Sequence, residues 1–107
     1  MTKPTKPTKL TRLTVPEIED TLQELGGWTL EGDTLSWSRM CGSFSEAFAL
    51  TTQVALLAER RDHHPDIALN YNRLTLRLTT HDAGGITKRD LEFARALGAV
   101  VGPVVSR

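Results

Sequence analysis

The chain has 107 residues, close to the common size of one domain, so a single small hydrophobic core is expected. Its thirteen basic and thirteen acidic residues cancel, so the overall charge gives no reason to expect a nucleic acid or a membrane as a partner. No apolar run is long enough to cross a bilayer and the single cysteine excludes an intrachain disulfide, so a soluble, cytoplasmic protein is predicted.

Basic charge is concentrated at the start of the chain. The first thirteen residues carry four basic side chains and no acidic one, mostly within the repeat TKPTKPTK, which leaves nine basic and thirteen acidic residues for the rest. Proline fixes φ and lacks a donor, and the repeat contains no apolar side chain. Residues 1–13 are therefore predicted to be a flexible basic tail without a secretion signal, and residues 14–107 a single domain.

The domain is expected to open with a capped helix and a hairpin. Thr14 can cap the helix, Glu17 can reach back to it, and Pro16 is tolerated in the first turn. Residues 28–40, WTLEGDTLSWSRM, predict two short strands around a turn at residues 31–33. The apolar face of the helix and its glycine stop are predicted at Ile18, Leu22, Leu25 and Gly26-Gly27.

Residues 43–62 give the strongest helical pattern. Ser43 and Glu46 have the spacing of a capping box. Because Pro65 disfavours the helical conformation in the preceding residue, the helix should finish near His63-His64. Its buried stripe is predicted to contain Ala47, Phe48, Thr51, Val54, Ala55 and Ala58, widened by Leu50 and Leu57.

A second hairpin and a third helix complete the predicted fold. A turn at residues 70–72 precedes RLTLRLTT, whose alternation places Leu74, Leu76 and Leu78 on one face. Residues 82–85 are expected to form a loop. A helix capped by Thr87, with Asp90 three residues later, should bury Leu91, Ala94, Leu97 and Val101 and stop at Gly102-Pro103. The fold class is α+β in the order α-β-β-α-β-β-α, with three helices on one face of a four-stranded antiparallel sheet.

Histidines are the best candidates for chemistry. His63 and His64 fall at a predicted helix end and His81 at a predicted strand end, while Glu59 lies four residues before His63 on the same helical face. A histidine titrating near neutrality can both give and accept a proton within one reaction cycle. These residues are therefore candidates for a general acid–base site, although their spacing alone favours a purely structural role.

Other readings of these residues stay open. A histidine near a helix C-terminus can simply stabilise the helix. A metal site is disfavoured because neighbouring side chains on a helix point about 100° apart and no HExxH or paired cysteine ligands occur. Cys41 could be a nucleophile, but nothing around it suggests activation. Strict alternation along the strand would point His81 away from the helices unless the strand breaks at Thr80.

Four stretches together resemble one known family. They are AERRDHHPD at residues 58–66, NYN at 70–72, LTTHD at 78–82 and KRD at 88–90. In this order and spacing they closely resemble the pterin-4a-carbinolamine dehydratases. The resemblance extends upstream through Gly27-Trp28 and residues 44–57, and so covers roughly residues 14–100.

The resemblance implies an activity and a site. The activity would be dehydration of 4a-hydroxytetrahydropterin to quinonoid dihydropterin, which recycles the cofactor of aromatic amino acid hydroxylases and needs no metal or organic cofactor. His63 and His81 would form the acid–base pair, with His64 auxiliary. The residues implied to bind or orient the substrate are Glu59, Asp62, Pro65, Thr79, Thr80, Asp82, Arg89 and Asp90.

The resemblance also implies assembly and an alternative function. Family members form dimers through sheet edges, and dimers can pair through helices into tetramers, so a homodimer or homotetramer is expected. An aromatic amino acid hydroxylase is expected as a pathway partner. The alternative is a binding module of the same fold, acting as a dimerisation cofactor for a transcription factor or as a Rubisco assembly chaperone.

Overall fold

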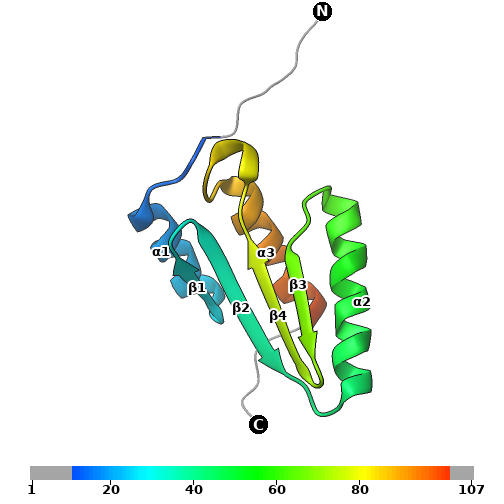
Figure 1. Ribbon diagram of the computed structural model, residues 1–107. Helices are drawn as coiled ribbons and strands as arrows, with labels where there is room; N and C mark the ends of the chain where they lie inside the picture. Colours follow the sequence, from blue (N-terminus) through cyan, green and yellow to red (C-terminus); the bar gives the residue numbers. More distant parts are fainter. Residues whose placement is uncertain (1–10, 102–107) are drawn as a thin grey trace, which may run out of the picture.

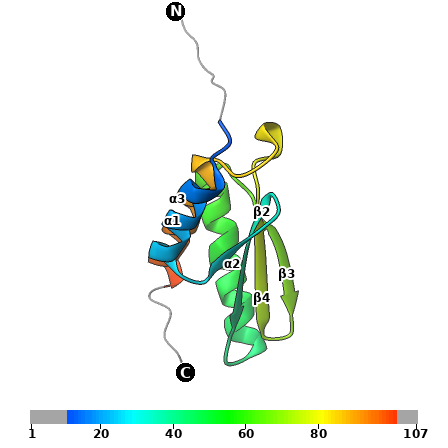
Figure 2. The same ribbon diagram turned by 90° about the vertical axis from the view of Figure 1, so that its left-hand side faces the viewer.

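The computed structural model describes residues 11–101 and contains one sheet backed by helices. Its elements in chain order are α1 (Val15–Leu25), β1 (Trp28–Glu31), β2 (Thr34–Met40), α2 (Phe44–Arg61), β3 (Asp66–Asn70), β4 (Arg73–Leu78), the short 3-10 turn η1 (His81–Ala83) and α3 (Lys88–Val101). Figure 1 shows the sheet in front of the helices, and Figure 2 shows all three α-helices on one side of it. The predicted order and layering are confirmed.

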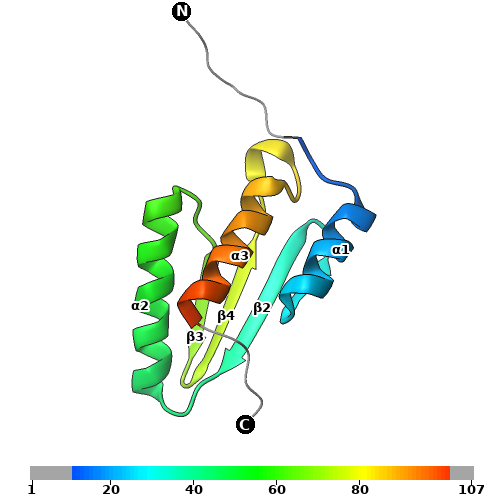
Figure 3. The same ribbon diagram turned by 180° about the vertical axis from the view of Figure 1, so that it is seen from behind.

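The four strands form an antiparallel sheet in the order β1-β2-β4-β3. Each hairpin supplies two neighbouring strands, and the hairpins meet where β2 pairs with β4. This register places Trp37 opposite Leu76 and Leu35 opposite Leu78, so the apolar positions of both hairpins share the face that the helices cover. Figure 3 views the molecule from the helix side, with α3 crossing in front of β4 and with α1 and α2 on either side of it.

Local capping fixes where the first two helices begin. Glu17 Oε1 accepts hydrogen bonds from the backbone N–H of Thr14 at 2.8 Å and from its hydroxyl at 3.0 Å, while Thr14 Oγ1 accepts from the N–H of Glu17. These bonds, the backbone one first, hold the pKa of the Glu17 carboxyl below its ordinary value of 4.5. Ser43 caps α2 by accepting from the N–H of Glu46 at 3.1 Å. Both predicted helix starts are confirmed, but Ser43 and Glu46 form only half of the predicted capping box, because Glu46 Oε1 accepts from the N–H of Gly42 instead of that of Ser43.

The core lies between the sheet and the helices. Leu35, Trp37, Leu74, Leu76 and Leu78 of the sheet face a helical layer that includes Ile18, Val54, Leu57, Phe93 and Leu97. Leu13 is half-buried against the same cluster, and its N–H donates to the carbonyl of Ile86 at 2.8 Å. Packed structure therefore starts at Leu13, one residue before the predicted domain boundary. Residues 11 and 12 of the predicted tail are exposed and outside any helix or strand, whereas residues 1–10 and the predicted stop at Gly102-Pro103 lie outside the described residues.

Two predicted helix faces differ from the structure. The buried positions of α2 are Ala47, Val54, Leu57 and Ala58, and Phe48 is 55% exposed, so the predictions that Phe48 and Ala55 are buried are wrong. The helix lies at the edge of the layer, beside β3, and its buried stripe is therefore narrow (Figure 1). In α3 the largest buried side chain is Phe93, which the predicted stripe omitted, and Leu91 and Val101 are only half-buried.

The face of the sheet that the helices leave open is polar. Ser38 and Thr75 share a 2.9 Å hydrogen bond on it, and Arg77 lies 3.3 Å from Glu31. This matches the expected polar side of an antiparallel sheet. Among residues 11–101, no helix is long and apolar enough to cross a membrane.

Candidate active site

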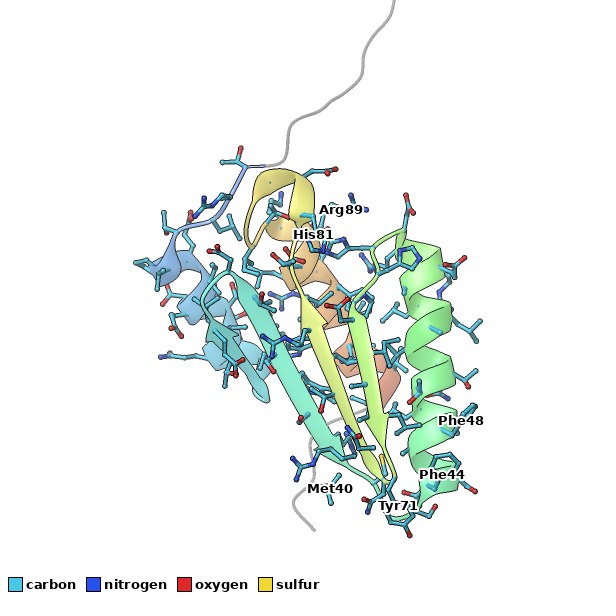
Figure 4. All side chains as sticks on the ribbon, viewed as in Figure 1. Met40, Phe44, Phe48, Tyr71, His81 and Arg89 are labelled. Atoms are coloured by element: carbon cyan, nitrogen blue, oxygen red, sulfur yellow. The ribbon has the colours of Figure 1, made fainter. Side chains whose placement is uncertain are left out.

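A cleft of about 270 Å³ opens at the end of the molecule where α2 stops, β4 ends and α3 begins. Figure 4 marks this end with His81 and Arg89. Histidines from two distant segments meet here, because His63 and His64 follow α2 and His81 follows β4. The residues that line the cleft are Asp62, His63, His64, Thr79, Thr80, His81, Asp82 and Arg89.

The end of α2 is set by a left-handed residue. The helix finishes at Arg61, two residues before the predicted end, because Asp62 has φ 50° and ψ 43°. This turn directs the N–H of His63 back to the carbonyl of Ala58 at 3.2 Å. The chain then leaves the helix axis, so the two histidines extend from the helix tip into the cleft region rather than continuing around the helix.

The break in β4 brings His81 to the same place. Regular pairing stops at Leu78, and Thr80 makes an isolated bridge to Gly85 around the turn η1. Thr79 still follows the open side of the sheet and donates its hydroxyl to the carbonyl of Asp33 at 2.7 Å. His81 begins the turn η1 and lines the cleft, so the strand alternation, which ends with β4 at Leu78, does not set its direction.

His63 is held by a buried carboxylate. Its Nε2 lies 2.6 Å from Oδ1 of Asp90, whose side chain is fully buried in the first turn of α3. Phe93 presents its ring edge-on to the imidazole, with centroids 6.4 Å apart. The only hydrogen bond found for this ring among residues 11–101 uses Nε2, which leaves Nδ1 as the nitrogen available to a ligand.

The second oxygen of Asp90 is also satisfied. Oδ2 accepts from the hydroxyl of Thr80 at 2.7 Å and from the backbone N–H of Thr87 at 2.9 Å. The two threonine hydroxyls are 2.8 Å apart. Both donors point to Oδ2, so Oδ1 is the oxygen that remains for His63. A carboxylate oxygen only accepts, so His63 donates to it from Nε2.

His64 has a different, more open environment. Its Nε2 lies 2.7 Å from Oε2 of Glu59, and both side chains are more than half exposed. The predicted contact of Glu59 with His63 is wrong, because the turn at Asp62 places His64, not His63, beside Glu59. An exposed ion pair of this kind contributes little to the free energy of unfolding. The contact does, however, orient the imidazole of His64 beside the cleft.

Arg89 closes the cleft between α2 and α3. Its Nη2 donates to the backbone carbonyl of Asp62, at the end of α2. The carbonyls at a helix C-terminus lack helical partners, so a guanidinium placed there satisfies one of them and ties the two helix ends together.

Most of the residues predicted for the site lie around the cleft. Glu59 and Asp90 do not line it but hold His64 and His63, and Pro65 is not among the lining residues. Within residues 11–101 no three histidine, cysteine or acidic side chains gather closely enough to hold a metal ion. Cys41 lies away from the histidines, beside two other hollows that share Arg39 and Glu46.

Thr87 and Phe93 are the two residues in contact with the site that sequence reasoning did not assign to it. Thr87 was expected only as a helix cap, although its capping partner Asp90 was already a candidate. The spacing of that cap, together with the short distance from His81 along the chain, is the signal that could have linked Thr87 to the site. Nothing in the sequence marks Phe93 as a neighbour of His63.

Sequence comparisons give one family. The family described as "Pterin 4 alpha carbinolamine dehydratase" matches residues 11–100. A Thermomicrobium roseum protein provisionally named pterin-4-alpha-carbinolamine dehydratase is 51% identical over 80 residues, which cover 75% of this chain and 86% of the relative. A Rhodopseudomonas palustris protein with the same provisional name is 45% identical over 88 residues, covering 80% and 87% of the two chains.

Solved structures agree. A crystal structure from Brucella melitensis, described as a transcriptional coactivator/pterin dehydratase, superposes with a TM-score of 0.80 at 38% identity and covers 86% of this chain and all of that one. A pterin dehydratase-like protein described as a RuBisCO assembly factor of the alpha-carboxysome has a TM-score of 0.62, with 74% and 94% of the chains covered. At 22% identity, it shows likeness of fold alone. The chain belongs to the pterin-4a-carbinolamine dehydratase family.

Proposed function

We propose that this protein dehydrates 4a-hydroxytetrahydropterin to quinonoid dihydropterin by histidine acid–base catalysis. The observation that carries the proposal is the meeting of His63, His64 and His81 in one cleft, with His63 backed by Asp90. The family membership and the provisional names of the relatives support the reaction type. Recycling of the pterin cofactor of aromatic amino acid hydroxylases is the proposed setting.

The reaction requires one proton to be delivered and one to be removed. The C4a–O bond breaks as the leaving hydroxyl takes a proton from an acid and departs as water. The lone pair of the neighbouring ring nitrogen forms the new C=N bond, and that nitrogen loses its proton to a base. One imidazolium and one neutral imidazole can supply these two steps, each contributing roughly 10²–10⁴ in rate.

We assign the acid–base pair to His63 and His81. Asp90 fixes one nitrogen of His63, which leaves the other for the substrate. His81 lies across the cleft on a different segment, so the two rings can approach different atoms of one bound pterin. His64, oriented by Glu59, is assigned to positioning at the rim. The two proton transfers complete this reaction, so the proposal includes no metal or organic cofactor.

Polar groups around the cleft suit a flat ring rich in donors and acceptors. Thr79, Asp82, Asp62 and Arg89 line it, and Arg89 is bonded to Asp62 between the two helix ends. A few polar contacts of fixed direction are what orients a ligand of this type. Pro65 is proposed only as a residue that directs the chain after the two histidines, since it follows them immediately.

The test is an absorbance assay in which an aromatic amino acid hydroxylase generates the carbinolamine. Wild type should accelerate its decay over buffer, and His63→Ala should lose most of this effect. Arg60→Ala, on the exposed surface of α2, is the matched control and should behave as wild type. A wild type that decays the carbinolamine no faster than buffer would refute the proposal.

We also propose that the protein is a cytoplasmic homodimer or homotetramer. β3 is an edge strand of the sheet, and an edge with free backbone groups favours pairing between copies. Phe44, Phe48 and Leu56 of α2 are each about half exposed, which suits burial against another helix. Sedimentation equilibrium would give a dimer or tetramer mass; a monomer at all concentrations would contradict this assembly.

A binding role is the second candidate. The Brucella melitensis structure is described as a transcriptional coactivator as well as a pterin dehydratase. On this chain, Met40, Phe44, Phe48 and Tyr71 are exposed at the end of the molecule opposite His81 and Arg89 (Figure 4). A protein partner bound there would be retained by His63→Ala and lost by Phe48→Asp, whereas loss with both variants would contradict a separate binding surface.

A further inference from the structure

Three buried polar side chains stand out in an otherwise apolar core. Within residues 11–101, the buried polar or charged residues are Thr80, Thr87 and Asp90, with exposures of 5%, 0% and 0%. All three belong to one hydrogen-bonded group directly behind His63. They come from two segments, the end of β4 and the start of α3, so the fold has to bring them together.

The hydroxyl protons of this group have a single possible direction. The Thr80 hydroxyl donates to Asp90 Oδ2, so its one proton is used and it must accept from Thr87. The Thr87 hydroxyl then donates to Thr80 and accepts from the backbone N–H of Arg89 at 3.2 Å. Both hydroxyl groups therefore donate in the direction of the Asp90 carboxylate, and each hydroxyl proton has an acceptor within this hydrogen-bonded group.

Stability alone does not account for such a group. Burying a carboxylate with its partners costs desolvation, and apolar side chains of similar volume often stabilise a core as well or better. Satisfied hydrogen bonds do, however, fix the plane of the carboxylate. With Oδ2 held by Thr80 and Thr87, Oδ1 has to face Nε2 of His63.

We propose that Thr87 and Thr80 are positioning residues for the acid–base reaction and act through Asp90. By holding the carboxylate plane, they keep His63 as the Nε2–H tautomer and leave Nδ1 directed to the cleft. This inference rests on the proposed function, in which His63 exchanges a proton with the pterin. Thr87 itself does not line the cleft, so its effect must pass through the other members of the group.

The experiment reads the tautomer of His63 by nitrogen-15 NMR in the protein without ligand. Wild type should show Nε2–H, whereas Thr80→Val and Thr87→Val, which keep the shape and remove the hydroxyl, should show a mixture of tautomers. Thr80→Ser and Thr87→Ser should restore the wild-type spectrum. Thr51→Val, which removes a half-buried hydroxyl that bonds only to the helix backbone, is the control and should change nothing.

Dehydratase kinetics provide the second readout. Thr87→Val should lower kcat by about 10- to 100-fold with KM within about twofold, because Thr87 does not line the cleft and a misplaced ring costs rate without removing substrate contacts. Thr80→Val should lower kcat to a similar extent. An Nδ1–H tautomer in wild type would overturn the inference even if no variant folds. Unchanged tautomer and kcat in both valine variants would also overturn it. If wild type is inactive but the tautomer shifts as expected, the positioning group stands and only the proposed reaction fails.

Discussion

His63 at the tip of α2 and Asp90 in the first turn of α3 are joined by a hydrogen bond of 2.6 Å, although 27 positions separate them in the chain. The imidazole is almost buried and the carboxylate fully so. The bond therefore couples the packing of the third helix to the orientation of a ring in the cleft. A change at position 90 should consequently alter activity and stability together.

Replacing Asp90 with Asn tests this coupling. An amide has one oxygen, so it cannot accept from both His63 and the pair of donors at Thr80 and Thr87. We expect kcat to fall by about 10²–10⁴ as the tautomer is lost. The free energy of unfolding should fall by about 1–3 kcal/mol for the unsatisfied donor. Urea denaturation and steady-state kinetics measure the two effects, and Asp66→Asn, exposed on β3, should leave both unchanged.

The two exposed histidines should differ in their effect on rate but not on stability. His81→Ala is expected to lower kcat by about 10²–10⁴, because it removes one proton carrier. His64→Ala should act mainly on KM, since that ring is assigned to positioning. Both side chains are exposed, so the free energy of unfolding should stay within about 0.5 kcal/mol of wild type. Equal kinetic losses in the two variants would contradict the division of roles.

Alanine variants of Phe93 and Phe48 test which phenylalanine contributes to the hydrophobic core. Phe93 is fully buried and packs against the imidazole of His63, whereas Phe48 is 55% exposed. Phe93→Ala should cost about 3–5 kcal/mol of unfolding free energy. Phe48→Ala should cost less than about 1 kcal/mol in the isolated chain. Chemical denaturation measures the free energy of unfolding of both variants. A similar loss in the two would contradict the central position of α3 in the core.

Acid should weaken the first helix through Glu17. Hydrogen bonds from Thr14 depress the pKa of the Glu17 carboxyl in the folded protein, so its contribution to stability is present above the unfolded value of 4.5 and is lost as pH falls through the lower folded value. Glu17→Gln should therefore lower Tm at neutral pH and converge with wild type in acid. Glu19→Gln, exposed on the same helix and outside the capping box, is the control. A Tm difference that persists unchanged below both pKa values would contradict this assignment.

Local signals explain why the fold could be predicted. Thr14–Glu17 and Ser43–Glu46 mark helix starts by side-chain chemistry within four residues. The leucines of β4 alternate because one face of an antiparallel sheet is buried. These relationships depend only on near neighbours along the chain, and the structure confirms each of them.

What could not be predicted depends on long-range packing. Phe48 has helical spacing with the core stripe, but α2 lies at the edge of the layer and leaves it exposed. Helix α2 ends two residues before its predicted end, because Asp62 adopts a left-handed conformation that the neighbouring sequence does not indicate. The bridge from Thr80 to Gly85 decides where His81 points, and the contact of His63 with Asp90 depends on how α3 packs. The family resemblance, rather than spacing, supplied the grouping of the three histidines.

The most direct measurement is an NMR titration of the three histidine rings with 7,8-dihydropterin, a pterin that has no C4a hydroxyl and therefore cannot be dehydrated. If the three histidines line one binding site, the ring signals of His63, His64 and His81 should shift together and saturate at one ligand per chain, with one common Kd. Saturable binding that leaves all three rings unshifted, or that moves only residues around Arg39 and Cys41, would contradict it.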